Sequence, residues 1–161
     1  MSHRTNPNIE QFSRQANGQW LFTATSGLES SLELPSVGCR LLLDEICSGP
    51  MHPSHGIKMQ YINPTTGGYP LPAIGAFVQL LPSGFRGSGH RSTDATVYCV
   101  IEGRGRSQVG DTSLDWKDHD IFVVPSWYLV SHEAQAESVL FRFSDRPIQK
   151  ALGIWREQSE L

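Results

Sequence analysis

Two histidines and a tyrosine in the second half of the chain have the side chains and spacing for chemistry in a shared site. His90 and Ser92 stand two residues apart in one apolar-bounded run, and Val130 and His132 stand two apart in another. Residues two apart on a β-strand point to the same face of its sheet. Imidazoles placed in this way can hold a metal ion, and an imidazole with the phenol of Tyr98 can serve as acid and base. We therefore expect residues 90, 92, 98, 130 and 132 to line one interior wall.

The segment that must position these side chains, residues 84–127, has the pattern of consecutive antiparallel strands. Its turns are marked by glycine: Gly103 and Gly105 permit positive φ, and Gly110 with Asp111 marks a tight hairpin. Short apolar runs bounded by turn residues predict strands at 73–82, 97–103, 121–127 and 138–145. Such meanders close most simply into a small barrel or a two-sheet jelly roll, so the chain is predicted to be all-β.

Further elements are predicted at the C-terminal end. The sequence PIQKALGIWREQ at 147–158 begins with a proline, which suits a first helical turn, and places Ile148, Leu152 and Trp155 at helical spacing. We expect a short amphipathic helix docked on the barrel by this apolar face.

The first fifty residues have a weaker pattern. WLFTA at 20–24 predicts a strand, and CRLLLDEI at 39–46 predicts a strand or a helical turn. Residues 1–17 are expected to form a tail or a short helix around residues 9–16, and residues 26–38 have loop composition. The predicted organisation is an N-terminal tail with extra strands at 1–50 and a barrel with a C-terminal helix at 51–161.

Composition limits the partners and the compartment. With 161 residues the chain is predicted to form one barrel domain, and its net charge of −3 without a basic stripe argues against nucleic acid. No run approaches the length of a membrane span, and the N-terminus has no apolar signal-type region. The three cysteines lack metal-type spacing and are odd in number, which favours a reducing compartment. We expect a cytoplasmic protein with no nucleic-acid and no membrane partner.

Two segments carry a resemblance to a known family. Gly84, His90, Ser92 and the EGRG turn at 102–105 resemble the first cupin motif, and WKDHDIFVVPSW at 116–127 resembles the second. From about His55 to the C-terminus the chain is similar to the C-terminal cupin half of gentisate 1,2-dioxygenases and their salicylate and 1-hydroxy-2-naphthoate relatives. The runs that carry this similarity are YINPTTGGYPLPAIGAFVQLLPSGFR, VYCVIEGRGRSQVGD, DIFVVPSW and FRFSDRPIQKALGIWRE. The first fifty residues show no such similarity.

The resemblance implies a single cupin-type jelly-roll barrel and Fe(II) held by three histidines. His90 occupies the first ligand position, but Ser92 and Val130 occupy the other two, and neither a hydroxyl nor an apolar side chain is a good ligand for iron. We therefore expect His90 to be the only metal-type residue left and the barrel to hold no iron. In the catalytic half of the family, Tyr98 corresponds to an arginine that binds the substrate carboxylate, and His132 corresponds to a histidine that contacts substrate.

Three functions remain open at this point. The first is a gentisate-dioxygenase-like oxidoreductase with an eroded iron site, which binds or transforms a small phenolic or benzoate-type molecule. Its substrate contacts would be His90, Ser92, Tyr98 and His132, with His132 and Tyr98 as the catalytic pair. The second is a non-catalytic, dimerising cupin half that lacks the iron-binding domain and forms a homo-oligomer through sheet pairing. The third is a metal-independent isomerase or cyclase that uses His132 and Tyr98.

The remaining histidines and one cysteine are expected to be structural. His52 and His55 lie in a proline-rich stretch and are expected to be solvated, and His119 is expected in an exposed turn. Arg91 should point away from the His90 face, and Cys99 should be an inert packed thiol.

Overall fold

The computed structural model describes residues 51–63 and 65–160 in full. Of the first fifty residues it describes the backbone of four strands: β1 (Asn8–Arg14), β2 (Trp20–Ser26), β3 (Ser31–Leu34) and β4 (Cys39–Leu42). The chain divides into two compact units, residues 1–50 and residues 51–161. Each unit is considered by itself.

The N-terminal unit contains two antiparallel hairpins. β1 pairs with β2 from Asn8↔Ser26 to Arg14↔Trp20, and β3 pairs with β4 from Ser31↔Leu42 to Leu34↔Cys39. β2 and β4 confirm the strands predicted at 20–24 and 39–46. The helix considered for residues 9–16 is wrong at residues 9–14, which belong to β1, whereas residues 15 and 16 lie outside the described residues; the loop expected at 26–38 contains β3. Both misses are hairpin partners of predicted strands, since pairing satisfies backbone groups irrespective of local composition.

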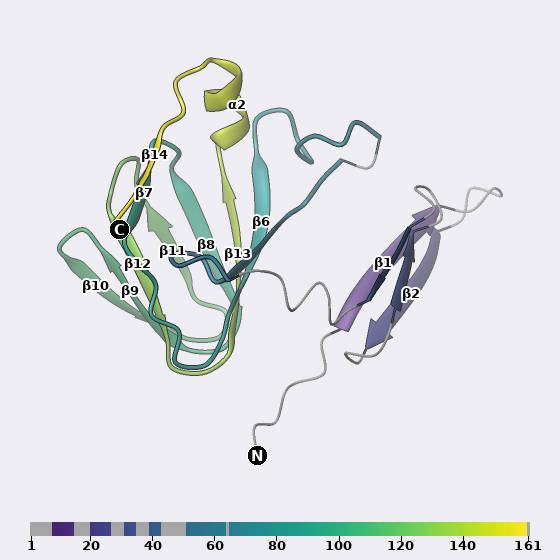
Figure 1. Cartoon of the computed structure of the whole chain (residues 1–161), viewed down its shortest axis with the longest axis horizontal. Coiled ribbons are helices and arrows are strands. Elements are labelled where there is room, and N and C mark those ends of the chain that lie inside the picture. The colour runs from purple at the N-terminus through teal and green to yellow at the C-terminus, as the bar shows by residue number, and fades with distance from the viewer. Residues whose placement is uncertain are drawn as a thin grey trace. The chain divides into compact units, whose positions relative to one another are not determined.

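The C-terminal unit is a sandwich of two five-stranded antiparallel sheets (Figure 1). One sheet has the order β10-β9-β12-β7-β14 and the other the order β11-β8-β13-β6-β5. The all-β, jelly-roll prediction is confirmed, with one short helix, α2, at the end of the sandwich. The elements are β5 (Ile57–Gln60), β6 (Gly75–Leu81), β7 (His90–Ser92), β8 (Thr96–Glu102), β9 (Gly105–Val109), β10 (Thr112–Trp116), β11 (Ile121–Val124), β12 (Val130–Ala134), β13 (Ser138–Ser144), α2 (Arg146–Ala151) and β14 (Glu157–Ser159).

Burial alternates along the central strands, so every second side chain enters the space between the sheets. β6 and β13 alternate between buried and half-buried positions over their whole length, as does the first part of β8. This is the period-two pattern of a strand with one face on a core. The apolar core contains Leu81, Phe85, Tyr98, Val100, Val109, Trp116, Val124, Val130, Ala134 and Leu140.

Glycine sets the geometry of the β9–β10 hairpin. Val109 pairs with Thr112, so Gly110 and Asp111 form the predicted two-residue turn, with Gly110 at φ 55°. Gly105 has no positive φ, contrary to the prediction. Its requirement is space, because a Cβ there would collide with the backbone oxygen of Glu133 and the ring of Trp116.

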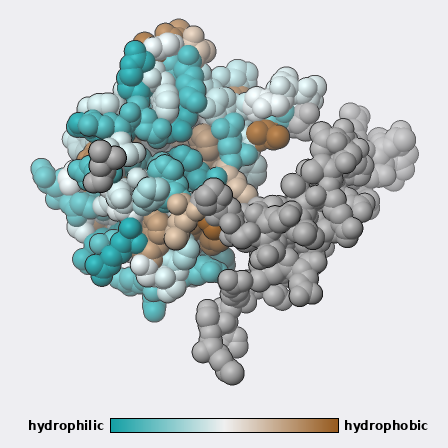
Figure 2. Space-filling model, viewed as in Figure 1, coloured by the Kyte–Doolittle hydropathy of each residue, from teal (hydrophilic) through white to brown (hydrophobic). Residues whose placement is uncertain are grey.

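α2 corrects the prediction of an amphipathic C-terminal helix. The helix has only six residues, and its buried residues are Arg146 and Pro147. Ile148 and Leu152 are 44% and 67% exposed, and apolar side chains cover the outside of α2 in Figure 2. Because the chain leaves the helix before Gly153, Trp155 cannot share a helical face with the other two residues. In the described part of the chain, no helix has the length and hydrophobicity needed to cross a membrane.

Candidate functional site

The predicted site residues meet inside the sandwich. His90, Tyr98, Val130 and His132 are all buried, with exposed fractions of 3% or less, and Val130 is the cross-strand partner of His90. Ser92 is half-buried. The side chains form two facing walls, however, and not one: residues 90, 92, 130 and 132 belong to the β12-β7 sheet, whereas Tyr98 lies on β8 of the opposite sheet.

His132 is held in one orientation by a buried hydrogen-bond chain. Its Nδ1 lies 2.7 Å from Ser107 Oγ, and the indole of Trp116 donates to the same hydroxyl at 2.8 Å. Nε2 of His132 is buried without a hydrogen-bond partner. Burial, followed by the charge of Arg142, lowers the pKa of His132 to about 3. The imidazole is therefore neutral at physiological pH.

Aromatic rings surround His132 on the Tyr98 side. The ring of Tyr98 stacks on Phe122 at 4.9 Å with an angle of 4° between the planes, and it meets the ring of His132 at 5.0 Å. The Tyr98 hydroxyl accepts a hydrogen bond of 3.0 Å from Nη1 of Arg142. Tyr98 thus links the histidine wall to a buried cation.

His55 corrects the prediction of a solvated loop histidine. It is 2% exposed, and its ring lies 4.1 Å from that of His90 in an edge-to-face arrangement. Reciprocal backbone hydrogen bonds between His52 and Gly56 close the turn at residues 52–56, which directs His55 into the interior. Gly56 at φ 63° was the available signal, because a Cβ there would collide with the backbone of Leu80.

The three buried imidazoles of this interior, those of His55, His90 and His132, all have lowered pKa values. Burial first, and then Arg142 and Lys58, lower the pKa of His55. Burial first, and then the neighbouring histidines His55 and His132, lower the pKa of His90. Nδ1 of His55 and Nδ1 of His90 are buried without hydrogen-bond partners. The interior therefore offers neutral ring nitrogens, not imidazolium charges.

Arg142 is the functional candidate that sequence reasoning missed. It lies in β13, is 2% exposed and is among the largest fully buried side chains of the described residues. Its neighbours on the same face are Leu140 and Ser144. The strand was predicted, but its alternation does not say which of its two faces is inside.

A second buried cation, Arg146, closes the end of the sandwich below α2. Its Nε lies 3.3 Å from Oδ2 of Asp94, and its Nη2 lies 3.7 Å from Glu157. The indole of Trp155 donates to the other oxygen of Asp94 at 2.8 Å. Burial alone would raise the pKa of Asp94, but Arg146 and hydrogen bonds from Ser144, Trp155 and Ser92 lower it to about 2.

The donor set does not fit the three-histidine iron site that the resemblance implies. Ser92 offers only a neutral hydroxyl, and Val130, the cross-strand partner of His90, offers only methyl groups. In residues 51–63 and 65–160, no group of three or more His, Cys, Asp or Glu side chains is arranged to hold a metal ion.

The other residues considered from the sequence lie outside this interior. His52 is exposed, His119 lies in an exposed turn at φ 70°, and Cys99 is half-buried on the outer face of β8. Arg91 stacks on Trp127 at 4.9 Å, and its Nη2 donates to Gln158 at 2.6 Å. These contacts are packing interactions between β7 and its neighbours.

The chain is similar in sequence to known ring-cleaving dioxygenases. It is 57% identical over 105 residues to gentisate 1,2-dioxygenase 1 of Aquipseudomonas alcaligenes, over 65% of this chain and 30% of that protein. It is 35% identical over 159 residues to 5-aminosalicylate 1,2-dioxygenase of Comamonas sp., over 95% and 42%. The second alignment reaches into the first fifty residues, where the sequence alone showed no resemblance. No family model matches the chain.

The comparison of structures agrees. Salicylate 1,2-dioxygenase of Pseudoaminobacter salicylatoxidans, solved with gentisate adducts, matches with a TM-score of 0.66 and 35% identity, over 73% of this chain and 32% of that one. The resemblance found in the motifs is thus confirmed. The chain spans between 30% and 42% of the length of these three proteins.

Proposed function

We propose that this chain, a relative of the gentisate 1,2-dioxygenase family, acts in the oxidative cleavage of small oxygenated aromatics as a cupin half with an eroded iron site. In this role it supports an iron-binding cupin domain and does not cleave the ring in its own barrel. The observation that carries the proposal is the outer face of the β11-β8-β13-β6-β5 sheet, which is apolar along four strands.

This outer face is more apolar than the interior face of the same sheet. Ile101, Ile121 and Val123 are 52%, 68% and 52% exposed. The interior face carries Gln79 and Arg142 instead. Sheets with apolar side chains on both faces are usually covered on both. The outward residues are Ala76, Val78, Leu80, Val97, Cys99, Ile101, Ile121, Val123, Val139, Phe141 and Phe143.

The proposed occupant of this face is a second cupin domain. The matched part makes up 30% and 42% of these two relatives, so each contains a further region of domain size. β11 also stands at the edge of its sheet, which leaves one side of the strand without a pairing partner within the described sheet. A pair of identical copies meeting through this face is the competing outcome, and it is the homo-oligomer expected from the sequence.

A chimera tests the support role. In the Aquipseudomonas enzyme, the 105 matching residues are replaced by those of this chain, and oxygen-dependent loss of gentisate is measured after iron loading. We expect the chimera to cleave gentisate and the full chain by itself to bind no stoichiometric iron and to cleave none. Adding Ile121→Lys and Val123→Lys should abolish cleavage, whereas the control Leu152→Lys, equally exposed but on α2, should not. Gentisate cleavage by the isolated full chain would contradict the proposal.

The second function that an observation favours is binding of a small oxygenated aromatic in the barrel itself. The stacked Tyr98–Phe122 pair faces His132, whose Nε2 lacks a partner, as does Nδ1 of His90. Flat phenolic molecules suit apolar walls with a few convergent polar groups. In this role His90, Tyr98 and His132 are contacts, and Ser92 contributes through Asp94.

Trp116 provides a direct test of this second function. Its indole is connected to His132 through Ser107, so a ligand that contacts His132 should change its fluorescence. We expect saturable quenching of the full chain by hydroquinone, weakened by His132→Gln and unchanged by His119→Gln. The absence of any saturable change with the wild-type chain would contradict ligand binding at His132.

The metal-independent isomerase or cyclase is the least supported of the functions considered. His132 would be its base, but an imidazole whose pKa has fallen to about 3 accepts a proton poorly at neutral pH. Tyr98 would be its acid, and its hydroxyl, which accepts from Nη1 of Arg142, keeps its own proton for donation, so the weak member of the pair is the base. The pair is better suited to holding a molecule than to moving its protons.

A further inference from the structure

We propose that the barrel interior contains a carboxylate-binding site anchored by Arg142. The site builds on the ligand-binding role above and adds to it the chemical class of the ligand, a small carboxylic acid in its ionised form. Arg142 lies outside both cupin motifs, which therefore assign it no role.

The free donors of Arg142 have the geometry of a carboxylate fork. Nη1 donates to the Tyr98 hydroxyl at 3.0 Å, whereas Nε and Nη2 are buried and have no hydrogen-bond partner. Nε–H and Nη2–H lie on the same edge of the guanidinium plane. Two parallel donors on one edge bind the two oxygens of a carboxylate together, which an ammonium group or a single amide cannot do.

The charge of Arg142 has no counterion within the described residues. The ion pairs of arginine in the described residues involve Arg146 and Arg106, and none of them includes Arg142. A buried charge without a partner is unfavourable, because its lost hydration is not replaced. A bound carboxylate would supply both the missing charge and the missing acceptors.

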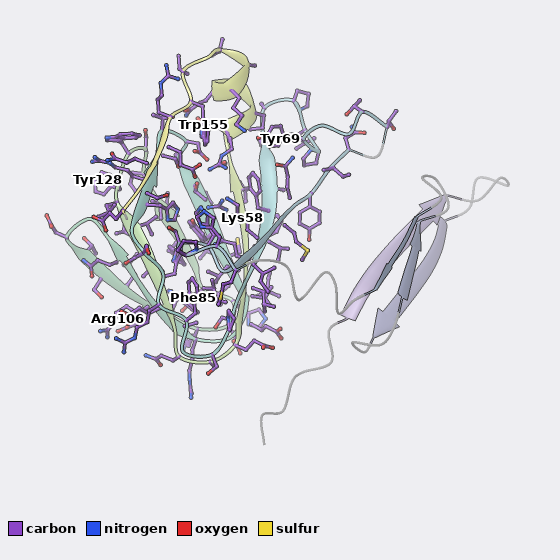
Figure 3. The ribbon with its side chains drawn as sticks, viewed as in Figure 1. Lys58, Tyr69, Phe85, Arg106, Tyr128 and Trp155 are labelled. Carbon is purple, nitrogen blue, oxygen red and sulfur yellow. The ribbon has the colours of Figure 1, made fainter. Side chains whose placement is uncertain are left out.

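Lys58 makes the same interior still more attractive to an anion. It is the cross-strand partner of Gln79, whose side chain is fully buried between the sheets. Figure 3 shows Lys58 near the centre of the C-terminal unit. Burial, and then the charges of Arg142 and Arg146, lower the pKa of Lys58 to about 7. Positive groups thus outnumber their carboxylate partners around this interior.

The surroundings of the fork favour a small, flat acid. The guanidinium carbon of Arg142 lies 5.1 Å from the ring centre of Phe77 and 5.7 Å from that of Tyr98. A cavity of about 520 Å³ is lined by Pro53 and Phe85, next to the inward turn that carries His55. Phe85 of this cavity belongs to the same apolar core as Tyr98, the hydrogen-bond partner of Arg142.

Benzoate and benzamide test the site, because they share a shape and differ in charge. Each is titrated into the full chain by calorimetry, with sodium chloride and phosphate as further arms. We expect benzoate to bind at least about tenfold more tightly than benzamide, as the fork requires an anionic pair of oxygens. Arg142→Lys keeps the charge and loses the fork, so it should remove this preference while leaving benzamide unchanged. The control Arg106→Lys, in an exposed pair with Asp115, should alter neither.

The outcomes separate this inference from the function it builds on. Equal binding of benzoate and benzamide would overturn the Arg142 anchor and leave aromatic binding standing. Binding of neither would overturn both. Chloride or phosphate binding as tightly as benzoate would show a general anion site and would overturn the carboxylate assignment. If Arg142→Lys fails to fold, the guanidinium Nε–H resonance of the wild-type chain decides: it should shift on adding benzoate and stay in place with benzamide.

Discussion

Two buried arginines four residues apart, Arg142 and Arg146, differ in whether a carboxylate lies beside the guanidinium group. Arg146 has the carboxylates of Asp94 and Glu157 at 3.3 and 3.7 Å and stacks on Trp155. Arg142 has the hydroxyl of Tyr98 and no carboxylate partner within the described residues. Both guanidinium groups lie over the ring of Phe77, at 5.1 and 5.4 Å, so their apolar surroundings are alike.

This difference in partners indicates which of the two buried charges stabilises the fold. Asp94 follows β7, Arg146 begins α2, and Glu157 begins β14, so the contacts of Arg146 join the C-terminal segment to a distant part of the chain. Trp155 lies beside α2 in Figure 3 and joins the same cluster. The side-chain hydrogen bond of Arg142 joins β13 to β8, which already pair along their backbones. Its charge is thus not needed to bring these strands together, as expected of a charge that serves binding.

The largest effect should follow from breaking the paired arginine. Arg146→Met leaves the carboxylate of Asp94 buried without its cation, and we expect the free energy of unfolding to fall by about 3–5 kcal/mol. Urea unfolding followed by circular dichroism measures it. Asp115→Asn, which breaks an exposed pair, should leave the midpoint in place. A loss for Arg146→Met no larger than that of the control would mean that the cluster does not hold the C-terminal segment.

Acid should weaken the same cluster. The pKa of Asp94 is about 2 in the folded chain and about 3.8 when unfolded, so its contribution is complete above pH 4 and is lost as the pH falls toward 2. The difference of nearly two pH units corresponds to about 2 kcal/mol. Unfolding free energies measured from pH 5 to pH 2 should show this loss in the wild-type chain and a shallower one in Asp94→Asn. Identical slopes for the two proteins would place the acid-sensitive group elsewhere.

Replacing the unpaired arginine should raise the free energy of unfolding, the opposite of the effect expected for Arg146→Met. Arg142→Met replaces a buried charge by an apolar side chain of similar length, and we expect the ligand-free chain to gain about 1–2 kcal/mol. The same urea titration measures the change, with Arg106→Met as the exposed control. A loss as large as that of Arg146→Met would show that Arg142 has a structural counterion, and the contrast between the two arginines would disappear.

The sequence could place the strands of the sandwich but not the contents of its interior. Runs such as VYCVIE and SVLFRFS alternate so regularly that their strands follow from period two alone. The same period leaves the inward face undecided. In β13 the outward residues Val139, Phe141 and Phe143 are more apolar than the inward Leu140, Arg142 and Ser144. A rule that buries the more apolar face therefore sends Arg142 to solvent.

Residues brought inward by turns were equally hidden. His55 enters the interior through a five-residue turn closed by backbone hydrogen bonds between His52 and Gly56, so apart from Gly56 little in the sequence indicates it. His90 and His132 could be predicted because both stand in strands with a defined register. The C-terminal helix was misjudged for a related reason, since its docking depends on the long-range Asp94–Arg146 pair and not on its apolar residues.

The smallest expected effect, that of Ser92→Ala on stability, distinguishes two interpretations of Ser92: a lost iron ligand, or a residue that supports Asp94. As an eroded iron position, Ser92 would be dispensable for stability, and Ser92→Ala would change little. Ser92, with Ser144 and Trp155, lowers the pKa of Asp94, and Asp94 pairs with Arg146. We expect Ser92→Ala to cost about 1 kcal/mol, the usual net value of one buried hydrogen bond, and to raise the pKa of Asp94. In the Arg146→Met background the same substitution should cost a different amount, because the two residues share one partner. If the two losses of unfolding free energy, measured by urea titration, are strictly additive, then Ser92 does not interact with the Asp94–Arg146 pair. Its position would then be only that of a lost iron ligand.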